Sequence, residues 1–288
     1  MIYADRRTGI IVQGATGKQG AFHIALMNEY SRQVGGVGVV AGVTPGKAGQ
    51  EVNGVPVYNS VRDALREHDA AASVLFVPAG AAGDSIMEAA NAGISLVVAI
   101  TEHIPVHDTM KAISYAGMNG CEVIGPNCPG LISPGEIKLG IMPAHLSSRG
   151  NIGVLSRSGT LTYEIVDELT KAGLGQSTVA GIGGDPVIGQ TFRDALAKFE
   201  GDPETRAIVL IGEVGGSLEE EGAKSSDIPL VAYIAGVSAP PEKRMGHAGA
   251  IIEGGEGDAR SKIKRLKEMG VPVASRPSEI PGLIRKLI

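Results

Sequence analysis

Tryptophan is absent from the 288-residue chain, and aromatic residues make up only 3% of it. So few aromatic side chains argue against an aromatic-lined pocket, and the 42 glycines instead predict many tight turns and packing of small residues. The net charge of -5 and the lack of a long basic run argue against nucleic acid as the main partner. No run of about 18 apolar residues occurs, so no membrane partner is expected.

Cysteine is nearly as scarce, with two residues, Cys121 and Cys128. Their spacing matches neither a metal-binding knuckle nor a redox CxxC pair, so we expect reduced thiols, no disulfide and no metal site. The first residues, MIYADRRTGIIVQ, have no apolar signal core behind their charges. The sequence therefore predicts a soluble, cytoplasmic protein.

A length of 288 residues favours two domains of roughly 120 to 160 residues each. In the first half, short β-branched runs alternate with helical patterns. The predicted strands are 9–13, 37–43, 73–77, 95–101 and 122–124, and the predicted helices are 21–30, 61–68, 85–92 and 108–118. Uninterrupted apolar runs such as LVVAI are typical of strands buried on both faces. The pattern predicts a doubly wound α/β domain, with a parallel sheet and helices on each side.

The stretch 126–148 interrupts this alternation. Its first part lies in GPNCPGLISPGE, whose prolines and glycines argue against a helix or a central strand. We place the domain boundary there. The alternation then resumes, with strands at 152–155, 178–182, 207–211, 230–234 and 271–274, and helices at 161–172, 191–199, 258–269 and from about 278. The second half is therefore predicted to form a second α/β domain.

A glycine-rich loop, GATGKQG at 14–20, follows the first predicted strand and opens the first helix. Free backbone N–H groups and the helix dipole make such a position suitable for phosphate binding. The spacing GxxGxxG differs from the strict GxGxxG of dinucleotide-binding domains, so a simple tight turn is the alternative.

The end of the second predicted strand indicates the kind of ligand. An NAD-binding domain places an acidic residue there for the ribose hydroxyls, but this chain has Lys47. A cation favours a ligand with a phosphate on its adenosine ribose, as in coenzyme A (CoA) and NADP; a solvated surface lysine is the alternative. Ile100, Thr101 and Glu102 end the fourth strand beside the crevice where such sheets bind ligands. We expect a ligand contact there, although Glu102 also suits a helix cap.

The second half has its own predicted phosphate loop, SRSGT at 156–160, between a strand and a helix that carries Tyr163. The GKS or GKT of a P-loop is missing, so the chain has a place for phosphate but no evident site for ATP. Two more glycine-rich strand ends, GIGGDP (181–186) and GEVGG (212–216), are predicted on the same edge of the sheet.

His247 lies among small residues in KRMGHAGAII (243–252), which leaves its imidazole accessible to a large anionic group. Such a setting suits a reactive histidine, and the alternative is a histidine that hydrogen-bonds within its own loop. Glu213 is predicted to face this loop and orient the imidazole, unless it is only an acid at a helix start. The other histidines lack such a setting and are expected to be ordinary polar residues: His23, His68, His103, His107 and His145.

Seven motifs occur in order along essentially the whole chain: GxTGxQG, VTPGK, GPNCPG, SRSGTLTYE, GIGGDP, GE(V)GG and KRMGHAGAII. In this order and at these separations they resemble the alpha subunits of succinate-CoA ligase (succinyl-CoA synthetase). The resemblance implies an N-terminal Rossmann-like CoA-binding domain at 1–125, a Pro/Gly-rich connection at 126–150 and a flavodoxin-like ligase domain at 151–288.

The resemblance also implies roles for single residues. His247 matches the phosphorylated histidine of the family, and Glu213 matches the acid paired with it. Ser158 and Gly159 match the helix start that holds the phosphohistidine, and Tyr163 matches a residue near the substrate. The residues that match CoA contacts of the family are Thr16, Gly17, Lys18, Gln19, Lys47, Ile100, Thr101 and Glu102.

The implied reaction is a reversible step of the tricarboxylic acid cycle. It converts succinate, CoA and ATP or GTP to succinyl-CoA, nucleoside diphosphate and phosphate through a phosphohistidine. In the family, a beta subunit supplies the nucleotide site, magnesium and a second phosphate-holding helix, within a heterodimer or heterotetramer. This agrees with the missing P-loop. Two departures are visible: His103 replaces a usual glycine, and the segment 217–228 is shorter and less helical than the usual crossover.

Two other functions stay open at this point. One is a related ligase subunit acting on malate or another short dicarboxylate, since nothing in the first half selects the acid. The other is a regulatory protein that binds CoA or NADP(H), which the first domain alone would permit. The combination of His247 with SRSGT argues against the regulatory protein.

Overall fold

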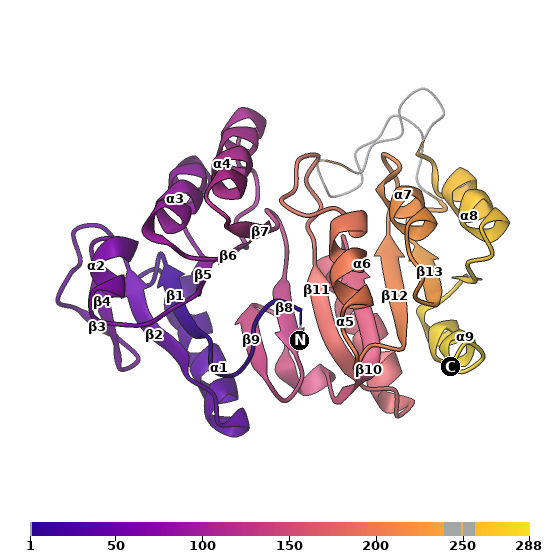
Figure 1. The fold of residues 1–288 in the computed structure, drawn as a ribbon, viewed down its shortest axis with the longest axis horizontal. Coiled ribbons are helices and arrows are strands. Elements are labelled where there is room, and N and C mark those ends of the chain that lie inside the picture. Colours follow the sequence, from indigo (N-terminus) through magenta and orange to yellow (C-terminus); the bar gives the residue numbers. More distant parts are fainter. Residues whose placement is uncertain (1, 239–248, 250–256) are drawn as a thin grey trace. The chain divides into compact units, whose positions relative to one another are not determined.

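The computed structural model describes residues 2–238, 249 and 257–288, which form two compact units (Figure 1). One unit consists of Tyr3–Met142 and Val187–Gly189, and the other of Met1–Ile2, Pro143–Pro186 and Gln190–Ile288. Each unit contains parallel strands flanked by helices, which confirms the predicted fold class of two α/β domains.

The sheet of the first unit has the strand order β3-β4-β2-β1-β5-β6-β7. Its strands are β1 Gly9–Gln13, β2 Gly38–Val43, β3 Glu51–Val52, β4 Val55–Tyr58, β5 Ala72–Leu75, β6 Leu96–Ala99 and β7 Glu122–Ile124. Neighbouring strands are parallel except for the pair β3 and β4. The chain winds from β1 to β2 on one side and later continues from β5 on the other, so the direction of winding reverses at β1.

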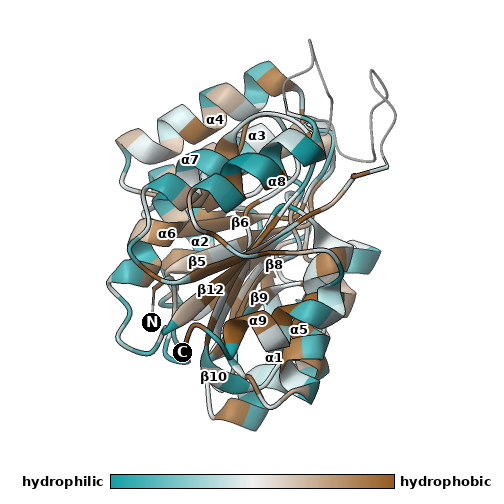
Figure 2. Ribbon diagram, turned by 90° about the vertical axis from the view of Figure 1, so that its right-hand side faces the viewer, coloured by the Kyte–Doolittle hydropathy of each residue, from teal (hydrophilic) through white to brown (hydrophobic). Residues whose placement is uncertain are grey.

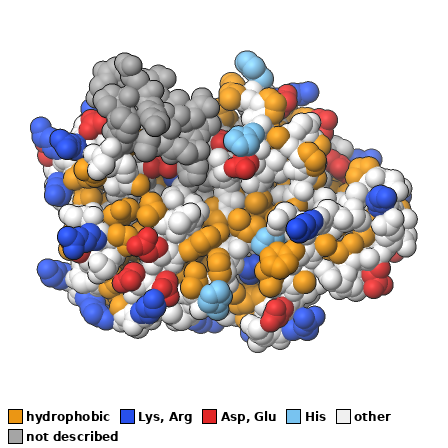
Figure 3. Space-filling model, turned by 180° about the vertical axis from the view of Figure 1, so that it is seen from behind, with side chains coloured by type: hydrophobic (Ala, Val, Ile, Leu, Met, Phe, Trp, Pro, Cys, Tyr) orange, Lys and Arg blue, Asp and Glu red, His pale blue; other side chains and the backbone are white. Residues whose placement is uncertain are grey.

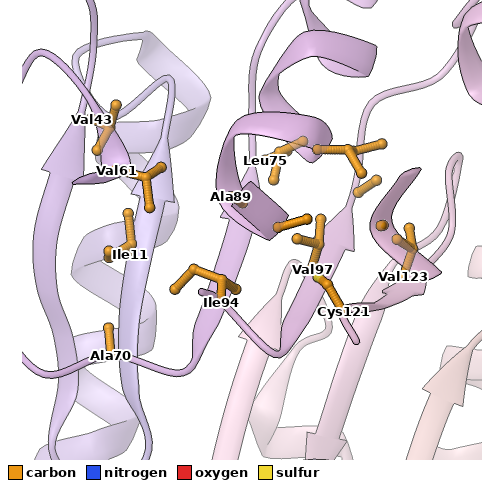
Figure 4. Close-up of a cluster of buried hydrophobic side chains, with 14 of the residues drawn as sticks. Ile11, Val43, Val61, Ala70, Leu75, Ala89, Ile94, Val97, Cys121 and Val123 are labelled. Atoms are coloured by element: carbon orange, nitrogen blue, oxygen red, sulfur yellow. The ribbon is translucent and has the colours of Figure 1, made fainter. Parts of the chain in front are cut away.

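Small apolar side chains fill the core of this unit. Figure 4 shows Ile11, Leu75 and Val97 from three strands and Ala89 from a helix as members of one buried cluster, and all four are fully buried. Strands buried on both faces explain the uninterrupted apolar runs of the sequence. The helices that cover the sheet are α1 Lys18–Val34, α2 Val61–Leu65, α3 Ala79–Ala92 and α4 Val106–Met118.

The stretch predicted as a connection contains a hairpin of two antiparallel strands, β8 Gly130–Ser133 and β9 Ile137–Gly140. The hairpin packs against α1, and the Gly135 N–H in its turn donates a hydrogen bond of 2.8 Å to the hydroxyl of Tyr30. The prolines leave the strands intact because they precede β8 or lie in the turn. The boundaries at 125 and 150 remain predictions.

In the second unit, the strands run parallel in the order β11-β10-β12-β13-β14. Numbered within the unit, this is the order 2-1-3-4-5 of flavodoxin-like sheets. The strands are β10 Arg149–Ser156, β11 Gln176–Gly181, β12 Ala207–Gly212, β13 Leu230–Ile234 and β14 Val273–Ala274.

The helices of this unit include one that the sequence did not predict. They are α5 Gly159–Lys171, α6 Phe192–Glu200, α7 Leu218–Lys224, α8 Ala259–Glu268 and α9 Ile280–Ile284, with 3-10 turns η1 Ala144–Leu146 and η2 Pro277–Glu279. The short α7 lies in the segment expected to be less helical. Three glutamates in its first turn favour a helix start there.

Helix α8 is strongly polar and is mainly teal in Figure 2. Blue side chains line the edge of the molecule where α8 and α9 lie (Figure 3). On its inner face, however, α8 buries Lys262 together with Ala259 and Leu266. None of the helices among the described residues has the length and apolar character needed to cross a membrane.

Candidate active site

The loop after β1 is shaped by close backbone contacts. Gly14 has a φ of 78°, which favours glycine, and its N–H donates to the carbonyl of Val43 at 2.8 Å. The first turn of α1 packs closely against the loop, because Gly20 has no side chain; a Cβ there would overlap the Gly14 carbonyl. Gly17 caps α1 without a side-chain hydrogen bond, and residues 17–19 are exposed. The start of α1 is therefore accessible to an anion.

Thr16 joins this loop to the one that follows β2. Its backbone N–H and its hydroxyl both lie 3.3 Å from the hydroxyl oxygen of Thr44. The side-chain oxygen of Asn59 accepts hydrogen bonds from the N–H groups of Gly46, at 2.8 Å, and Ala48, at 3.3 Å, and so holds the turn that presents Lys47. The Lys47 side chain is exposed. Sequence reasoning identified Lys47 but not Thr44 or Asn59, which support the turn from other segments.

Ile100, Thr101 and Glu102 follow β6 at the same carboxyl edge of the sheet. The Thr101 hydroxyl donates to the carbonyl of Val77 at 2.8 Å, which ties this segment to the end of β5. Glu102 is exposed, 3.8 Å from His103. His103 has a φ of 62°, in the left-handed region that favours glycine. The structure thus gives a backbone reason why glycine would be the usual residue at this position.

The predicted CoA contacts therefore share one edge of one sheet. Their segments follow β1, β2 and β6, which lie in the order β2-β1-β5-β6. In parallel sheets, ligands bind at this edge near the point where the winding reverses. The placement suits a ligand that crosses the edge, and the contacts themselves remain predictions.

A buried basic pair lies close to this edge. Burial, followed by the charge of Lys138, lowers the pKa of His23 to about 4, and burial lowers the pKa of Lys138 to about 8. The His23 ring stacks on Phe76 with centroids 5.2 Å apart. The Lys138 ammonium donates to the carbonyl of Gly140 at 2.9 Å. His23 is thus neutral near pH 7 and acts here as a packing residue.

In the second unit, Ser156–Gly159 forms a tight loop between β10 and α5. The Ser158 hydroxyl caps α5 by accepting from the Leu161 N–H at 3.4 Å. The Ser156 hydroxyl accepts from the Ser158 N–H at 3.0 Å and donates to the Ser158 carbonyl at 2.8 Å. Beyond its chain neighbours and its own helix, no atom of the described residues lies within 4 Å of where a Gly159 side chain would begin. Ser158 and Gly159 are half-buried, and the backbone N–H groups of the helix start are suited to a phosphate.

Arg157, within this loop, is the functional candidate that sequence reasoning missed. Its side chain is only 3% exposed. One terminal nitrogen, Nη1, donates to the Gly215 carbonyl and to Glu219 Oε1, both at 3.2 Å. The other, Nη2, lies 3.4 Å from Oε1 of Glu213. The predicted acid is therefore held by a buried arginine from the phosphate loop.

Glu219 and Lys262 continue this charge network into the core. Glu219 Oε1 accepts from the Glu213 N–H at 3.1 Å, while Oε2 pairs with the Lys262 ammonium. Both side chains are fully buried, and Lys262 also lies 3.7 Å from Glu220. The sequence carries a signal for the burial of Lys262. It lies at helical spacing between Ala259 and Leu266, on the apolar face of an amphipathic helix.

Gly249, within the histidine segment 243–252, and Gly257, beyond it, both contact glycine-rich strand ends. The Gly249 N–H donates to the Gly184 carbonyl at 3.2 Å, and the Gly257 carbonyl accepts from the Gly215 N–H at 2.8 Å. His247 lies outside the described residues, and its predicted pairing with Glu213 remains a prediction. Tyr163 lies half-buried on α5, one turn beyond the loop.

The cysteines lie in the first unit, and the Cys128 thiol donates to the carbonyl of Ala99 at 3.3 Å, at the end of β6. Cys121 and Cys128 are buried thiols that form no disulfide, and burial raises the pKa of Cys121 to about 11. Over residues 2–238, 249 and 257–288, no three His, Cys, Asp or Glu side chains are grouped so that they could hold a metal ion.

Two family models match the chain, one in each half. The CoA binding domain matches residues 5–103, and the CoA-ligase model matches residues 155–271. Solved structures support the same fold. Methanosaeta concilii ATP citrate lyase, in complex with (3S)-citryl-CoA, has a TM-score of 0.88 at 22% identity. The match includes 100% of this chain and 50% of the lyase chain. A dinucleotide forming acetyl-coenzyme A synthetase 1 of Ca. Korarchaeum cryptofilum has a TM-score of 0.70 at 21% identity, over 93% of this chain and 58% of that one. These matches define a two-domain chain of the CoA-ligase class.

Curated relatives narrow this class. Succinate--CoA ligase [ADP-forming] subunit alpha 2 of Archaeoglobus fulgidus is 56% identical over 100% of this chain and 99% of its own length. The corresponding alpha subunit of Aquifex aeolicus is 54% identical over 100% of this chain and 94% of its own length. The chain belongs to the family of succinate-CoA ligase alpha subunits, which confirms the resemblance found in the motifs.

Proposed function

We propose that this chain is the alpha subunit of a succinate-CoA ligase that forms a nucleoside diphosphate. The observation that carries the proposal is the 52–56% identity to such subunits over nearly the whole chain. Both glycine-rich helix starts and the GHAG histidine segment lie within the matched length. The reaction joins succinate and CoA while a nucleoside triphosphate is cleaved, and it is reversible.

The first unit is proposed to bind CoA along the carboxyl edge of its sheet. The start of α1, with Thr16–Gln19, suits the diphosphate because the helix dipole and backbone N–H groups favour negative charge. Lys47 would neutralise the 3'-phosphate of the ribose. Ile100, Thr101 and Glu102 are proposed contacts for the remainder of the molecule, at the end of β6.

The second unit is proposed to carry the phosphoryl group on His247. A ring nitrogen attacks the terminal phosphorus of the triphosphate, and the bond to the nucleoside diphosphate breaks. A succinate carboxylate oxygen then takes the phosphoryl group as the P–N bond breaks. The CoA sulfur, having lost its proton, attacks the carbonyl carbon of succinyl phosphate, and phosphate leaves.

Residues around the histidine segment would support these transfers. The start of α5 at Ser158 and Gly159 would stabilise the phosphoryl charge through backbone N–H groups. Glu213 is proposed to accept a hydrogen bond from the N–H of one ring nitrogen of His247, so that the other, unprotonated nitrogen is the nucleophile. Tyr163 is proposed to contact the substrate.

A beta subunit is the proposed partner. It would bind ATP or GTP together with Mg²⁺, which neutralises phosphate charge, because this chain has no GKS or GKT loop in its sequence. We propose a heterodimer or heterotetramer in the cytoplasm. Phosphoryl transfer would then take place across the interface of the two subunits.

The test is turnover by the chain co-expressed with its beta partner. Nucleoside diphosphate release is measured with CoA and either succinate, malate or another short dicarboxylate. Succinate should give the highest kcat/KM. A higher value for malate would reassign the acid, whereas CoA binding without any acid-dependent turnover would support the regulatory alternative and refute the proposed function.

A further inference from the structure

Glu213 is held at two points, its backbone N–H and its carboxylate. Its backbone N–H donates to Glu219 at 3.1 Å, and its side chain lies 3.4 Å from the Arg157 guanidinium. Glu219 also accepts from Arg157 at 3.2 Å, so the three residues form a closed set of contacts. All three are buried, which strengthens each polar contact because water does not screen it.

The network is fixed on its inner side by Lys262. This lysine pairs with the second carboxylate oxygen of Glu219, and neither side chain is accessible to solvent. Gly212 makes room for Glu219, because a side chain at Gly212 would overlap that carboxylate. The Glu219 carboxylate that contacts Arg157 is therefore itself held in place by Lys262. This contact fixes the direction of the Arg157 guanidinium from the core of the unit.

The outer side of Arg157 faces Gly249. A Cβ added to Gly249 would lie 2.9 Å from Arg157 Nη2 and 3.0 Å from the Gly184 carbonyl. Nη2 is the same nitrogen that contacts Glu213. Arg157 Nε is buried and has no hydrogen-bond partner among the residues that the structure describes. The guanidinium thus connects the phosphate loop, the predicted acid and the residue two positions beyond His247.

We infer that Arg157 is a positioning residue for the phosphoryl-transfer chemistry: it fixes the Glu213 carboxylate and supports the chain at Gly249, with Glu219 and Lys262 as its buried anchor. The inference rests on the proposed function. A planar guanidinium makes these contacts in fixed directions, whereas a lysine ammonium at the same position would keep only the charge.

Arg157→Lys in the co-expressed pair provides the first test. The charge stays, so the buried carboxylates keep a counter-ion, but the forked contacts are lost. We expect phosphate incorporation from γ-labelled nucleotide to slow about 10- to 100-fold at saturating nucleotide, since small misplacements in a site have effects of this order. The KM for CoA should not change. Arg149→Lys is the matched control, because Arg149 contacts Glu204 at 3.0 Å in an exposed pair of the same unit.

Gly249→Ala provides a second test, in which the side chains of Arg157, Glu213, Glu219 and Lys262 are not replaced. The added methyl group would press on Arg157 and Gly184, so incorporation should again slow at least about tenfold. Gly282→Ala is its control, because outside its own helix no atom in the described part of the chain lies within 4 Å of the new methyl group. Circular dichroism of each variant establishes that the chain is folded.

The outcomes separate the two claims. If the wild-type pair incorporates phosphate and both Arg157→Lys and Gly249→Ala do so at the wild-type rate, the inference is overturned and the proposed function stands. A misfolded Arg157→Lys leaves the decision to Gly249→Ala, whose normal rate would by itself overturn the inference. A wild-type pair that incorporates no phosphate would refute the proposed function and the inference together.

Discussion

Replacing Lys262 by methionine should strongly destabilise the second unit. Lys262 is fully buried, pairs with Glu219 and lies 3.7 Å from Glu220. Methionine fills nearly the same space, so the main effect is the loss of the positive charge beside two buried carboxylates. Removing one partner of a buried ion pair costs ~3–5 kcal/mol. We therefore expect the free energy of unfolding to fall by about this amount.

The control lies two positions along the same helix. Lys264 is exposed and lies 3.8 Å from Glu268, also exposed, in an i,i+4 pair. Lys264→Met should change the free energy of unfolding by less than ~0.5 kcal/mol. The chain has no tryptophan, so unfolding in urea is best followed by far-ultraviolet circular dichroism.

The double variant Lys262→Met, Glu219→Gln tests the cause. It removes both charges of the pair, so part of the lost stability should return because one buried carboxylate no longer lacks its partner. The reasoning is refuted if Lys262→Met unfolds at the same urea concentration as Lys264→Met. It is also refuted if the double variant loses as much stability as Lys262→Met and Glu219→Gln lose together when each is measured alone.

Three further predictions concern the active chain. His247→Ala should abolish turnover, measured with the partner present, but leave CoA binding to the first unit intact; activity above a few per cent would contradict the role of His247. Lys47→Glu should weaken the binding of CoA more than that of dephospho-CoA in calorimetric titrations, and equal losses would show that Lys47 does not bind the 3'-phosphate. The unfolded chain binds a proton at His23 near pH 6.5, but the folded chain does so only near pH 4. The free energy of unfolding should therefore fall by at most ~3 kcal/mol as the pH is lowered from 6.5 to 4. His23→Gln should lose less stability over that pH range in urea unfolding; an identical loss would show that another group is responsible.

Much of the fold could be predicted because its signals are local. The apolar runs of β1, β5 and β6 and the glycines before α1 each act within a few residues, and the structure has elements at all of these places. The hairpins β3–β4 and β8–β9 were missed because strands of two to four residues carry too little periodicity. Helix α7 was underestimated because Gly222 and the serines after it suggested a loop.

The candidate site could be predicted only where residues act through their place on a strand end. Thr16, Lys47 and Thr101 follow strands, and a parallel sheet brings such ends to one edge. The contacts of Arg157 with Glu213 and Glu219 depend on three separate segments, so no spacing in the sequence indicates them. Lys262 lies farther still along the chain, in the predicted helix 258–269, and no role was predicted for it.

Gly212 and Glu219 share one volume, since a side chain at Gly212 would overlap the carboxylate. Evolution can therefore change these positions only in a fixed sequence of steps. Loss of Glu219 has to come first, and it leaves Lys262 buried without its main anion, which is itself costly. A lineage that departs from glycine at 212 should also have replaced Glu219 and Lys262, so the three positions should covary among relatives as a unit.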